Sequence, residues 1–374
     1  MKHSPLDDLE PALEGLEREG LLRIPSSPRV SEINFCSNDY LGLAARTMDL
    51  PWASGAGASR LVSGDHDVHR ALEESLARWL ALDSALLFTS GYAANVGALS
   101  ALVQPGDTVL SDALNHASII DGLRLSRART QIVPHGDLSA WEAGLRSAGG
   151  RIWAVTESYF GMDADSPDLG ALRALCDAAG AALYVDEAHA LGVLGPGGRG
   201  LCAEAGIVPD VLVGTLGKAL GAGGAFVSGR GALRRWLWNR ARSFVFSTGL
   251  SPALAGRALL NLRDLQADDG VRLHVLQLAT RLRRAMAALG CHVPGYGPVV
   301  PWVIGDSLRA VSVARSLCDS GLFVRAIRPP TVPAGTARLR LTVTGAHRPE
   351  HIEHLVDRIA ELRISWEDSS SSPG

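Results

Sequence analysis

The sequence predicts an α/β protein with two domains: a large domain on a mainly parallel seven-stranded sheet, and a smaller α+β domain at the C-terminal end. The chain has 374 residues, which is more than one domain usually contains. Between residues 61 and 246, short apolar runs alternate with segments of helical periodicity. Strands that are apolar on both faces and separated by helices are typical of a parallel sheet covered on two sides.

The first predicted element is an amphipathic helix. Leu6, Leu9, Leu13 and Leu16 recur at helical spacing with acidic residues between them. We expect this leucine face to pack on another part of the protein. The strands of the large domain follow, at 85–88, 108–110, 131–133, 152–155, 182–185, 211–213 and 224–227.

The pattern changes after residue 250. A long, arginine-rich helical segment leads to apolar runs at 301–304, 323–325 and 337–342, and a closing helix is expected at 351–362. The chain ends in a low-complexity serine run. The expected divisions are an N-terminal helix and segment at 1–45, the large domain at 46–250, the small domain at 251–366 and a disordered tail at 367–374.

Composition and charge exclude several classes of function. A net charge of −3, a pI near 6.4 and arginines spread along the chain give no reason to expect nucleic acid as a partner. The five cysteines are widely separated and form no CxxC pair, which indicates reduced thiols in a cytoplasmic protein and no metal site. The start of the chain has no secretory signal. The longest uncharged stretch, 84–106, contains glycine and proline, so no membrane span is expected.

Two of the expected strands are followed by side chains that can take part in catalysis. Lys218 lies on a glycine-flanked turn after the run 211–213, and the run 182–185 leads to Asp186 and His189. The carboxyl ends of parallel strands meet at one edge of a sheet, where ligands bind. An amine, a carboxylate and a hydrogen-bond donor are what an enzyme needs to hold the aldehyde, the ring nitrogen and the phenolic oxygen of pyridoxal 5'-phosphate (PLP). The sequence therefore predicts a PLP site at this edge.

A phosphate site is predicted where a helix begins after the strand 85–88. The small residues at Ser90 and Gly91 let the helix start with free N–H groups and its positive dipole end exposed. An ordinary strand-to-helix turn has the same pattern, but Thr215 could supply a hydroxyl to the same anion.

His116 follows another strand end. A lone histidine is more often structural than catalytic, although a flat ring there could stack on a flat cofactor.

Seven short motifs, taken together and in order, carry a resemblance. They are SNDYLGL at 37–43, ASRLVSG at 58–64, SGYAAN at 90–95, NHAS at 115–118, VDEAH at 185–189, GTLGK at 214–218 and RPPTVPAGTARLRL at 328–341. In this combination the sequence resembles the α-oxoamine synthases, which are similar to class II aminotransferases. The resemblance covers nearly the whole chain and implies a PLP-dependent transferase of fold type I.

The resemblance implies roles for four catalytic residues. Lys218 would hold the cofactor covalently and later act as the base on the substrate α-carbon. Asp186 would pair with the ring nitrogen and keep it protonated. His189 would contact the phenolic oxygen, and His116 would stack on the ring while facing the substrate.

Further cofactor contacts are implied in the same way. The backbone of Gly91 and Tyr92 would meet the phosphate and the cofactor edge, with Thr215 assisting. Ser247 and Thr248 resemble residues that reach the phosphate of the neighbouring subunit. The resemblance thus implies a homodimer with shared active sites.

The implied substrates are an amino acid and an acyl thioester. Arg340 matches the arginine that binds the amino-acid carboxylate, and Asn38 would add an amide donor. Arg23 is the counterpart of an N-terminal arginine at the substrate site, and Thr331 matches a substrate-contacting threonine beside the CoA channel. The implied reaction is a decarboxylative condensation of L-alanine with pimeloyl-CoA, or with a pimeloyl group on acyl carrier protein.

Several alternatives stay open at this point. Glycine with a shorter acyl-CoA would use the same residues, as in 2-amino-3-ketobutyrate CoA ligase or 5-aminolaevulinate synthase. A catalytically silent partner subunit would keep the fold without the chemistry, and the glycine run 195–200 could belong to a nicotinamide-binding protein. One departure is clear: Gly161 stands where the family commonly has a serine that touches the cofactor, so that one hydroxyl contact is either missing or supplied elsewhere.

Overall fold

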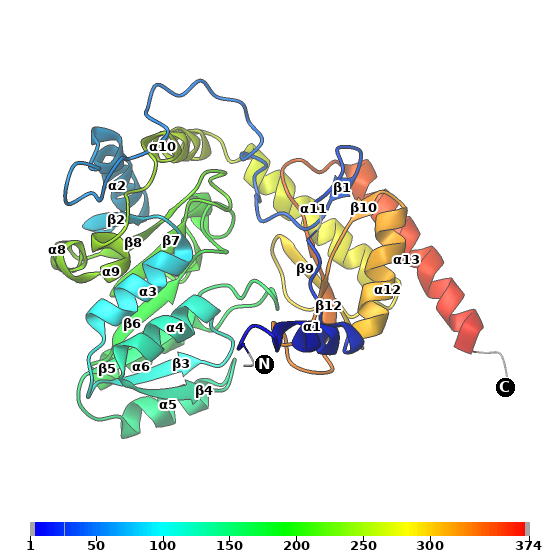
Figure 1. Ribbon diagram of the computed structural model, residues 1–374, viewed down its shortest axis with the longest axis horizontal. Coiled ribbons are helices and arrows are strands. Elements are labelled where there is room, and N and C mark those ends of the chain that lie inside the picture. Colours follow the sequence, from blue (N-terminus) through cyan, green and yellow to red (C-terminus); the bar gives the residue numbers. More distant parts are fainter. Residues whose placement is uncertain (1–3, 26, 371–374) are drawn as a thin grey trace. The chain divides into compact units, whose positions relative to one another are not determined.

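The computed structural model describes residues 4–25 and 27–370, which divide into two compact units (Figure 1). The larger unit contains Asn38–Gly161 and Asp165–Val275. The smaller contains the chain up to Ser37, Met162–Ala164 and the chain from Leu276 on. The boundary therefore falls at 275/276 rather than at the expected 250/251, and most of the expected segment 1–45 belongs to the smaller unit.

The larger unit is built on a seven-stranded sheet with the order β2-β8-β7-β6-β5-β3-β4. Only β8 runs against its neighbours β2 and β7, and the other pairs are parallel. All seven predicted strands are confirmed. Their bounds are β2 Ser84–Phe88, β3 Thr108–Asp112, β4 Arg129–Val133, β5 Ile152–Glu157, β6 Ala182–Asp186, β7 Val211–Thr215 and β8 Ala225–Gly229.

Helices cover this sheet, and side-chain caps fix where several of them start. Ser90 accepts from the N–H of Ala93 at 3.1 Å, and Asp137 accepts from Ala140 at 2.9 Å. Such caps satisfy N–H groups that have no acceptor within the helix. The helices are α2 Asp67–Leu80, α3 Gly91–Leu102, α4 Ala117–Ser126, α5 Leu138–Ser147, α6 Leu169–Ala179, α7 Leu201–Glu204, α8 Gly231–Arg240, α9 Arg242–Val245 and α10 Pro252–Ala267, with the short 3-10 helix η1 Pro196–Gly198.

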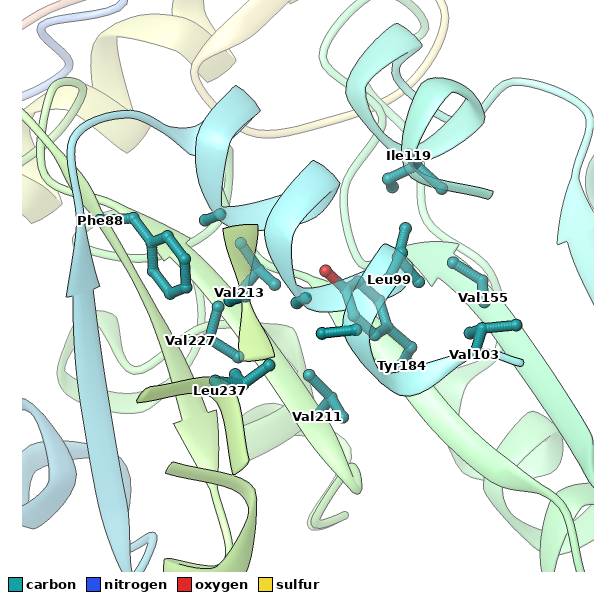
Figure 2. Close-up of a cluster of buried hydrophobic side chains, with 14 of the residues drawn as sticks. Phe88, Leu99, Val103, Ile119, Val155, Tyr184, Val211, Val213, Val227 and Leu237 are labelled. Atoms are coloured by element: carbon teal, nitrogen blue, oxygen red, sulfur yellow. The ribbon is translucent and has the colours of Figure 1, made fainter. Parts of the chain in front are cut away.

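The core of the larger unit lies between α3 and the sheet. Figure 2 shows Leu99 of α3 close to Tyr184 of β6, with Val211, Val213 and Val227 from the neighbouring strands β7 and β8. All five side chains are buried. Because burial of one large apolar side chain contributes about 1.5–3 kcal/mol, this cluster holds α3 firmly against the sheet. The start of α3 is thereby fixed relative to the strand ends.

The smaller unit contains two short sheets. Antiparallel strands form the order β11-β12-β9, and β1 pairs in parallel with β10. The expected strand 323–325 is instead two strands, β10 and β11, separated by two residues. The bounds are β1 Ile33–Asn34, β9 Val299–Gly305, β10 Leu322–Phe323, β11 Ala326–Ile327, β12 Ala337–Thr342, α1 Leu9–Arg18, α12 Ser307–Asp319 and α13 Pro349–Ser370.

Three residues from the middle of the chain also belong to the smaller unit. Arg338 of β12 donates to the carboxylate of Asp163 at 2.6 Å and to the carbonyl oxygen of Met162 at 3.0 Å. Ala164 accepts from the N–H of Tyr296 at 2.8 Å. These bonds attach the segment 162–164 to β12 and to the loop before β9. This attachment was not predictable from the sequence, because it joins residues that lie far apart in the chain.

Three further expectations need correction. The long helical segment after residue 250 is two helices, α10 and α11 Gly270–Ala288, because Asp268 leaves the helical conformation and its carboxylate accepts from the N–H of Gly270 at 2.7 Å. No described residue of α1 is buried, so its leucine face does not pack on the chain as expected. Residues 367–370 of the expected tail continue α13, and 371–374 lie outside the described residues.

No helix among the described residues is long and apolar enough to cross a bilayer. Within the same residues, no group of three or more histidine, cysteine or acidic side chains is arranged to hold a metal ion.

A charged cluster joins β3, β4 and the segment after β5. His135 lies 3.0 Å through Nδ1 from Asp112 and 3.1 Å through Nε2 from Asp165. Hydrogen bonds to these two carboxylates raise the pKa of His135 to about 10. Both ring nitrogens then donate, so the imidazolium form clamps the two acids together.

We expect His135→Gln to destabilise the larger unit in a pH-dependent way. The folded-state pKa lies above the ordinary value of 6.5, so the stabilisation is complete below about pH 6.5 and is lost as pH rises to about 10. Urea unfolding at pH 6 should show a loss of roughly 1–3 kcal/mol, because the Asp112 carboxylate is left buried. The loss should shrink at pH 10, and the exposed His292→Gln should show neither effect. A loss that is the same at both pH values would contradict the charged clamp.

Candidate active site

The carboxyl ends of β5, β6 and β7 lie side by side at one edge of the sheet. Glu157 at the end of β5 is paired with Asp186 at the end of β6, and Thr215 at the end of β7 is paired with Ala225 at the start of β8. The parallel direction of β5, β6 and β7 places these ends together. This edge carries most of the catalytic and cofactor residues expected from the sequence.

Asp186 is buried and held by hydrogen bonds. Its Oδ2 accepts from Asn95 Nδ2 at 2.7 Å, and its Oδ1 accepts from the N–H of Ala188 at 2.8 Å. Asn95 is itself fixed, because its Oδ1 accepts from the Tyr184 hydroxyl at 2.7 Å. These two donors hold the carboxylate in a fixed orientation.

Asn95 also links Asp186 to His116. Asn95 Nδ2 donates to Ser118 Oγ at 2.9 Å, and Ser118 Oγ lies 2.8 Å from His116 Nδ1. The N–H of Ser118 points at the same ring nitrogen, at 3.2 Å. With a backbone donor aimed at it, Nδ1 serves as an acceptor, which leaves the ring proton on Nε2. The sequence motif at 90–95 contained Asn95, but its spacing did not reveal this role.

His116 is within electrostatic reach of both Asp186 and Lys218. Burial lowers the pKa of His116, the charge of Asp186 raises it, and the charge of Lys218 lowers it. The net pKa is lower than the ordinary value of 6.5, so the ring is neutral at pH 7. A neutral ring at the N-cap of α4 suits a stacking role. The structure thus brings His116, Asp186 and Lys218 together as expected.

Glu157 is a site residue that sequence reasoning missed. Burial, followed by the negative charge of Asp186, raises its pKa to about 8, while Lys218 opposes the rise. Its Oε1 accepts from the backbone N–H of His116 at 2.8 Å. The position just after an apolar strand, beside the strand that ends in Asp186, was the signal that could have found it.

Lys218 stands on a tight turn after β7. Its carbonyl oxygen accepts from the N–H of Gly221 at 2.9 Å, which closes the turn. Gly221 has a φ of +54°, and a Cβ there would lie 2.6 Å from the backbone of Leu43 and Ala44, so only glycine fits. The sequence contains two lysines, Lys2 and Lys218, among 36 basic residues. Where a permanent cation would suffice the chain uses arginine, so Lys218 marks a place that needs an amine able to lose its proton.

His189 follows β6 and forms a hydrogen bond with the side chain of Tyr40. Its Nδ1 lies 2.7 Å from the hydroxyl of Tyr40, which is fully buried. Nearby, Asn38 Oδ1 is buried and has no hydrogen-bond partner among the described residues. A buried amide oxygen without a partner is costly, and it marks a group available to a ligand.

The alternative site suggested by the run 195–200 lies after β6, at η1, and not between a first strand and its helix.

The expected phosphate contacts lie around the ends of β2 and β7. Gly91 and Tyr92 form the first turn of α3, and the exposed Tyr92 side chain donates to Asp121, which leaves only its backbone for an anion. Thr215 Oγ1 donates to the carbonyl oxygen of Gly224 at 3.2 Å. Ser247 and Thr248 border one pocket together with Thr89, the residue after β2.

The expected substrate residues Arg23, Thr331 and Arg340 belong to the smaller unit. Arg340 of β12 is buried and donates to Thr342 Oγ1 at 3.1 Å. Arg23 Nη2 donates to Thr331 Oγ1 at 3.1 Å. These last two residues line a cavity of about 660 Å³ whose lining also includes Arg29, Arg315, Arg325 and Arg328 together with Leu21, Leu22, Val311, Phe323 and Ile327.

The residues at the sheet edge fit PLP by their chemistry. Asp186 offers an oriented carboxylate for a pyridinium nitrogen, Lys218 an amine for an aldehyde, and His189 a ring nitrogen for a phenolic oxygen. The first turn of α3 offers N–H groups for a phosphate.

Comparison with known proteins decides the family. The model for aminotransferase class I and II matches residues 30–359. The chain belongs to the aminotransferase class I and II family. Similar curated members are 8-amino-7-oxononanoate synthases: one from Aromatoleum aromaticum is 46% identical over 88% of each chain, and one from an Anaeromyxobacter species is 46% identical over 97% of each.

Solved structures of family members share the fold. A serine palmitoyltransferase from Sphingomonas wittichii is 27% identical, covers 96% of this chain and 98% of its own, and superposes with a TM-score of 0.88. An 8-amino-7-oxononanoate synthase from Francisella tularensis is 26% identical over 91% of this chain and 99% of its own, with a TM-score of 0.77. The family membership makes this protein a PLP-dependent enzyme of the α-oxoamine synthase type with the fold-type-I architecture.

We expect Asn95→Ala to weaken cofactor binding, because it removes the bonds that orient Asp186 and Ser118. Loss of one hydrogen bond to a charged group costs about 1.5–3 kcal/mol, so the dissociation constant for PLP should rise roughly tenfold or more. Titration of apoprotein with PLP, followed by absorbance, measures this. The exposed Asn239→Ala should bind as the wild type does. Wild-type affinity in folded Asn95→Ala would contradict the role of the Asn95 network.

Proposed function

We propose that this protein catalyses the decarboxylative condensation of L-alanine with pimeloyl-CoA, or with a pimeloyl group on acyl carrier protein. The products would be 8-amino-7-oxononanoate, carbon dioxide and CoA or the free carrier, a reaction of biotin biosynthesis. The names of curated relatives at 43–46% identity support this choice of reaction within the family. The observation that carries the chemistry is the placement of Lys218 within electrostatic reach of His116 and Glu157, beside the oriented Asp186.

PLP, when bound, supplies an electron sink for charge that develops on the substrate α-carbon. Asp186 would hold a proton on the ring nitrogen, and Asn95 would keep the Asp186 carboxylate in place. Lys218 would take the α-proton of alanine as a general base and return a proton to the product. His116, neutral at pH 7, would cover one face of the ring and exclude water from it.

The overall bond changes balance when one proton is taken up from solvent. The α-carbon of alanine loses its proton and forms a bond to the thioester carbonyl carbon, and the thiolate of CoA leaves and takes a proton. The bond between the α-carbon and the alanine carboxylate then breaks, which releases carbon dioxide. A proton added to the α-carbon completes the product.

We propose that the smaller unit recognises the carboxylate and acyl groups of the substrates. Arg340 is buried and has the planar fork that pairs with an amino-acid carboxylate. The cavity beside Arg23 and Thr331 is lined by both apolar side chains and arginines. This lining suits an acyl chain that bears anionic groups. Asn38 would offer its amide to the substrate, since its Oδ1 has no partner among the described residues.

We also propose a cytoplasmic homodimer with shared active sites. The four leucines of the N-terminal segment are 41–72% exposed, and an exposed apolar face of this kind is typical of a protein interface. Ser247 and Thr248 would then contact the phosphate in the neighbouring subunit. All five cysteines are free, as expected for a reducing compartment.

We expect Lys218→Ala to lower turnover about a thousandfold or more, because the base is removed. CoA release from pimeloyl-CoA and L-alanine measures this, and Lys2→Ala is the matched control that should keep the parent rate. The same assay with glycine and acetyl-CoA tests the related acyltransfer reaction. Turnover by Lys218→Ala at the parent rate would contradict the mechanism. No turnover by the wild type with either substrate pair would indicate a silent partner subunit.

We expect Arg340→Lys to raise the KM for L-alanine about tenfold or more, because lysine cannot replace the two-pronged contact of a guanidinium with a carboxylate. The KM for pimeloyl-CoA should change little. The control is Arg281→Lys, at an exposed ion pair with Glu353. An unchanged KM for L-alanine would place the carboxylate elsewhere.

A further inference from the structure

Tyr40 occupies a rigid position in the larger unit. Its ring is fully buried, and it lies within a turn in which the Asp39 carboxylate accepts from the N–H groups of Leu43 at 2.9 Å and Ala44 at 2.8 Å. The Tyr40 N–H donates to the carbonyl oxygen of Asn38 at 2.8 Å. A phenol held in this way has little freedom to follow a moving partner.

The partner of this phenol is the ring of His189. The Tyr40 oxygen lies 2.7 Å from His189 Nδ1, and the two rings meet edge to face with centroids 6.2 Å apart. If the hydroxyl donates, Nδ1 is the acceptor and the imidazole proton must sit on Nε2. Fixing one ring nitrogen in this way selects the tautomer and thus what the other nitrogen can do.

Gly161 lies against the face of the same histidine ring, near Nε2. A Cβ at this position would lie 2.5 Å from His189 Nε2, 2.6 Å from Cε1 and 2.7 Å from Cδ2. Its backbone is not in the left-handed region, so conformation does not demand glycine here. The demand comes from the His189 ring, which fills the volume that any side chain at 161 would need. The ring is therefore held at Nδ1 by Tyr40 and lies against the Gly161 backbone near Nε2.

We propose that Tyr40 is a positioning residue that holds His189 as the Nε2–H tautomer, with Gly161 leaving the space that this orientation requires. The inference rests on the proposed PLP function, in which His189 Nε2–H donates to the phenolic oxygen of the cofactor. It also explains the missing serine at 161: in this chain the imidazole ring occupies the place of that side chain, and one donor serves where the family commonly has two.

The test compares holoenzyme of the wild type with Tyr40→Phe. Correlation spectra of ¹⁵N-histidine-labelled protein, assigned with His189→Gln, report which ring nitrogen carries the proton. We expect the Nε2–H form in the wild type and a mixture of tautomers in Tyr40→Phe. The pKa of the bound cofactor, followed by its visible band, should rise by about one unit, because a donor to the phenolate oxygen is weakened.

A second variant keeps Tyr40 and displaces the ring from the other side. Gly161→Ala should cause the same tautomer mixture and the same rise in the cofactor pKa. Tyr296→Phe, at an exposed tyrosine, and Gly149→Ala, at a glycine with open space around its Cβ position, are controls that should match the wild type.

An Nδ1–H tautomer in the wild type, or a folded Tyr40→Phe holoenzyme with unchanged tautomer and cofactor pKa, would overturn this inference. Failure of the wild type to bind PLP contradicts the proposed function instead, so the two failures are distinguishable.

Discussion

The fold depends on a concentration of charge at one edge of a buried sheet. Asp186 and Glu157 end adjacent parallel strands, and Lys218 follows the next one. Burial, and after it the nearby charge of Asp186, raises the pKa of Glu157 to about 8. The charge of Lys218 opposes this rise, and a cationic cofactor ring would do the same. The surrounding hydrogen bonds hold the Asp186 carboxylate in one orientation.

Asn95 connects the core packing to this chemistry. It lies on α3, which the apolar cluster around Leu99 presses onto the sheet. From that helix its amide holds Asp186 and reaches His116 through Ser118. The same helix begins at Gly91, where the phosphate would bind. One well-packed element thus holds Asp186 and His116 in place and would also position the phosphate of a bound cofactor.

Much of this could be predicted from the sequence, and the reasons for the rest are physical. The strands were predictable because most of them are apolar runs between helical segments, although β4 is largely exposed. Lys218, Asp186 and His189 were predictable because they stand where such strands end. Glu157 was missed because one acid after a strand looks like an ordinary surface charge. The roles of Asn95 and Tyr40 depend on contacts between distant segments, which no local spacing encodes. The prediction that the leucine face of α1 packs on this chain was wrong. Amphipathic spacing indicates that a helix has an apolar face, but it does not indicate what covers that face.

The central claim is that the amine of Lys218 binds the aldehyde of PLP. Because the chain contains one other lysine, Lys2, reduction of the holoenzyme with borohydride and mapping of the modified peptide give an answer with two possible sites. The account predicts the pyridoxyl group on Lys218, in wild-type protein and in Lys2→Ala alike. A pyridoxyl group found only on Lys2, or none on either lysine, would contradict it.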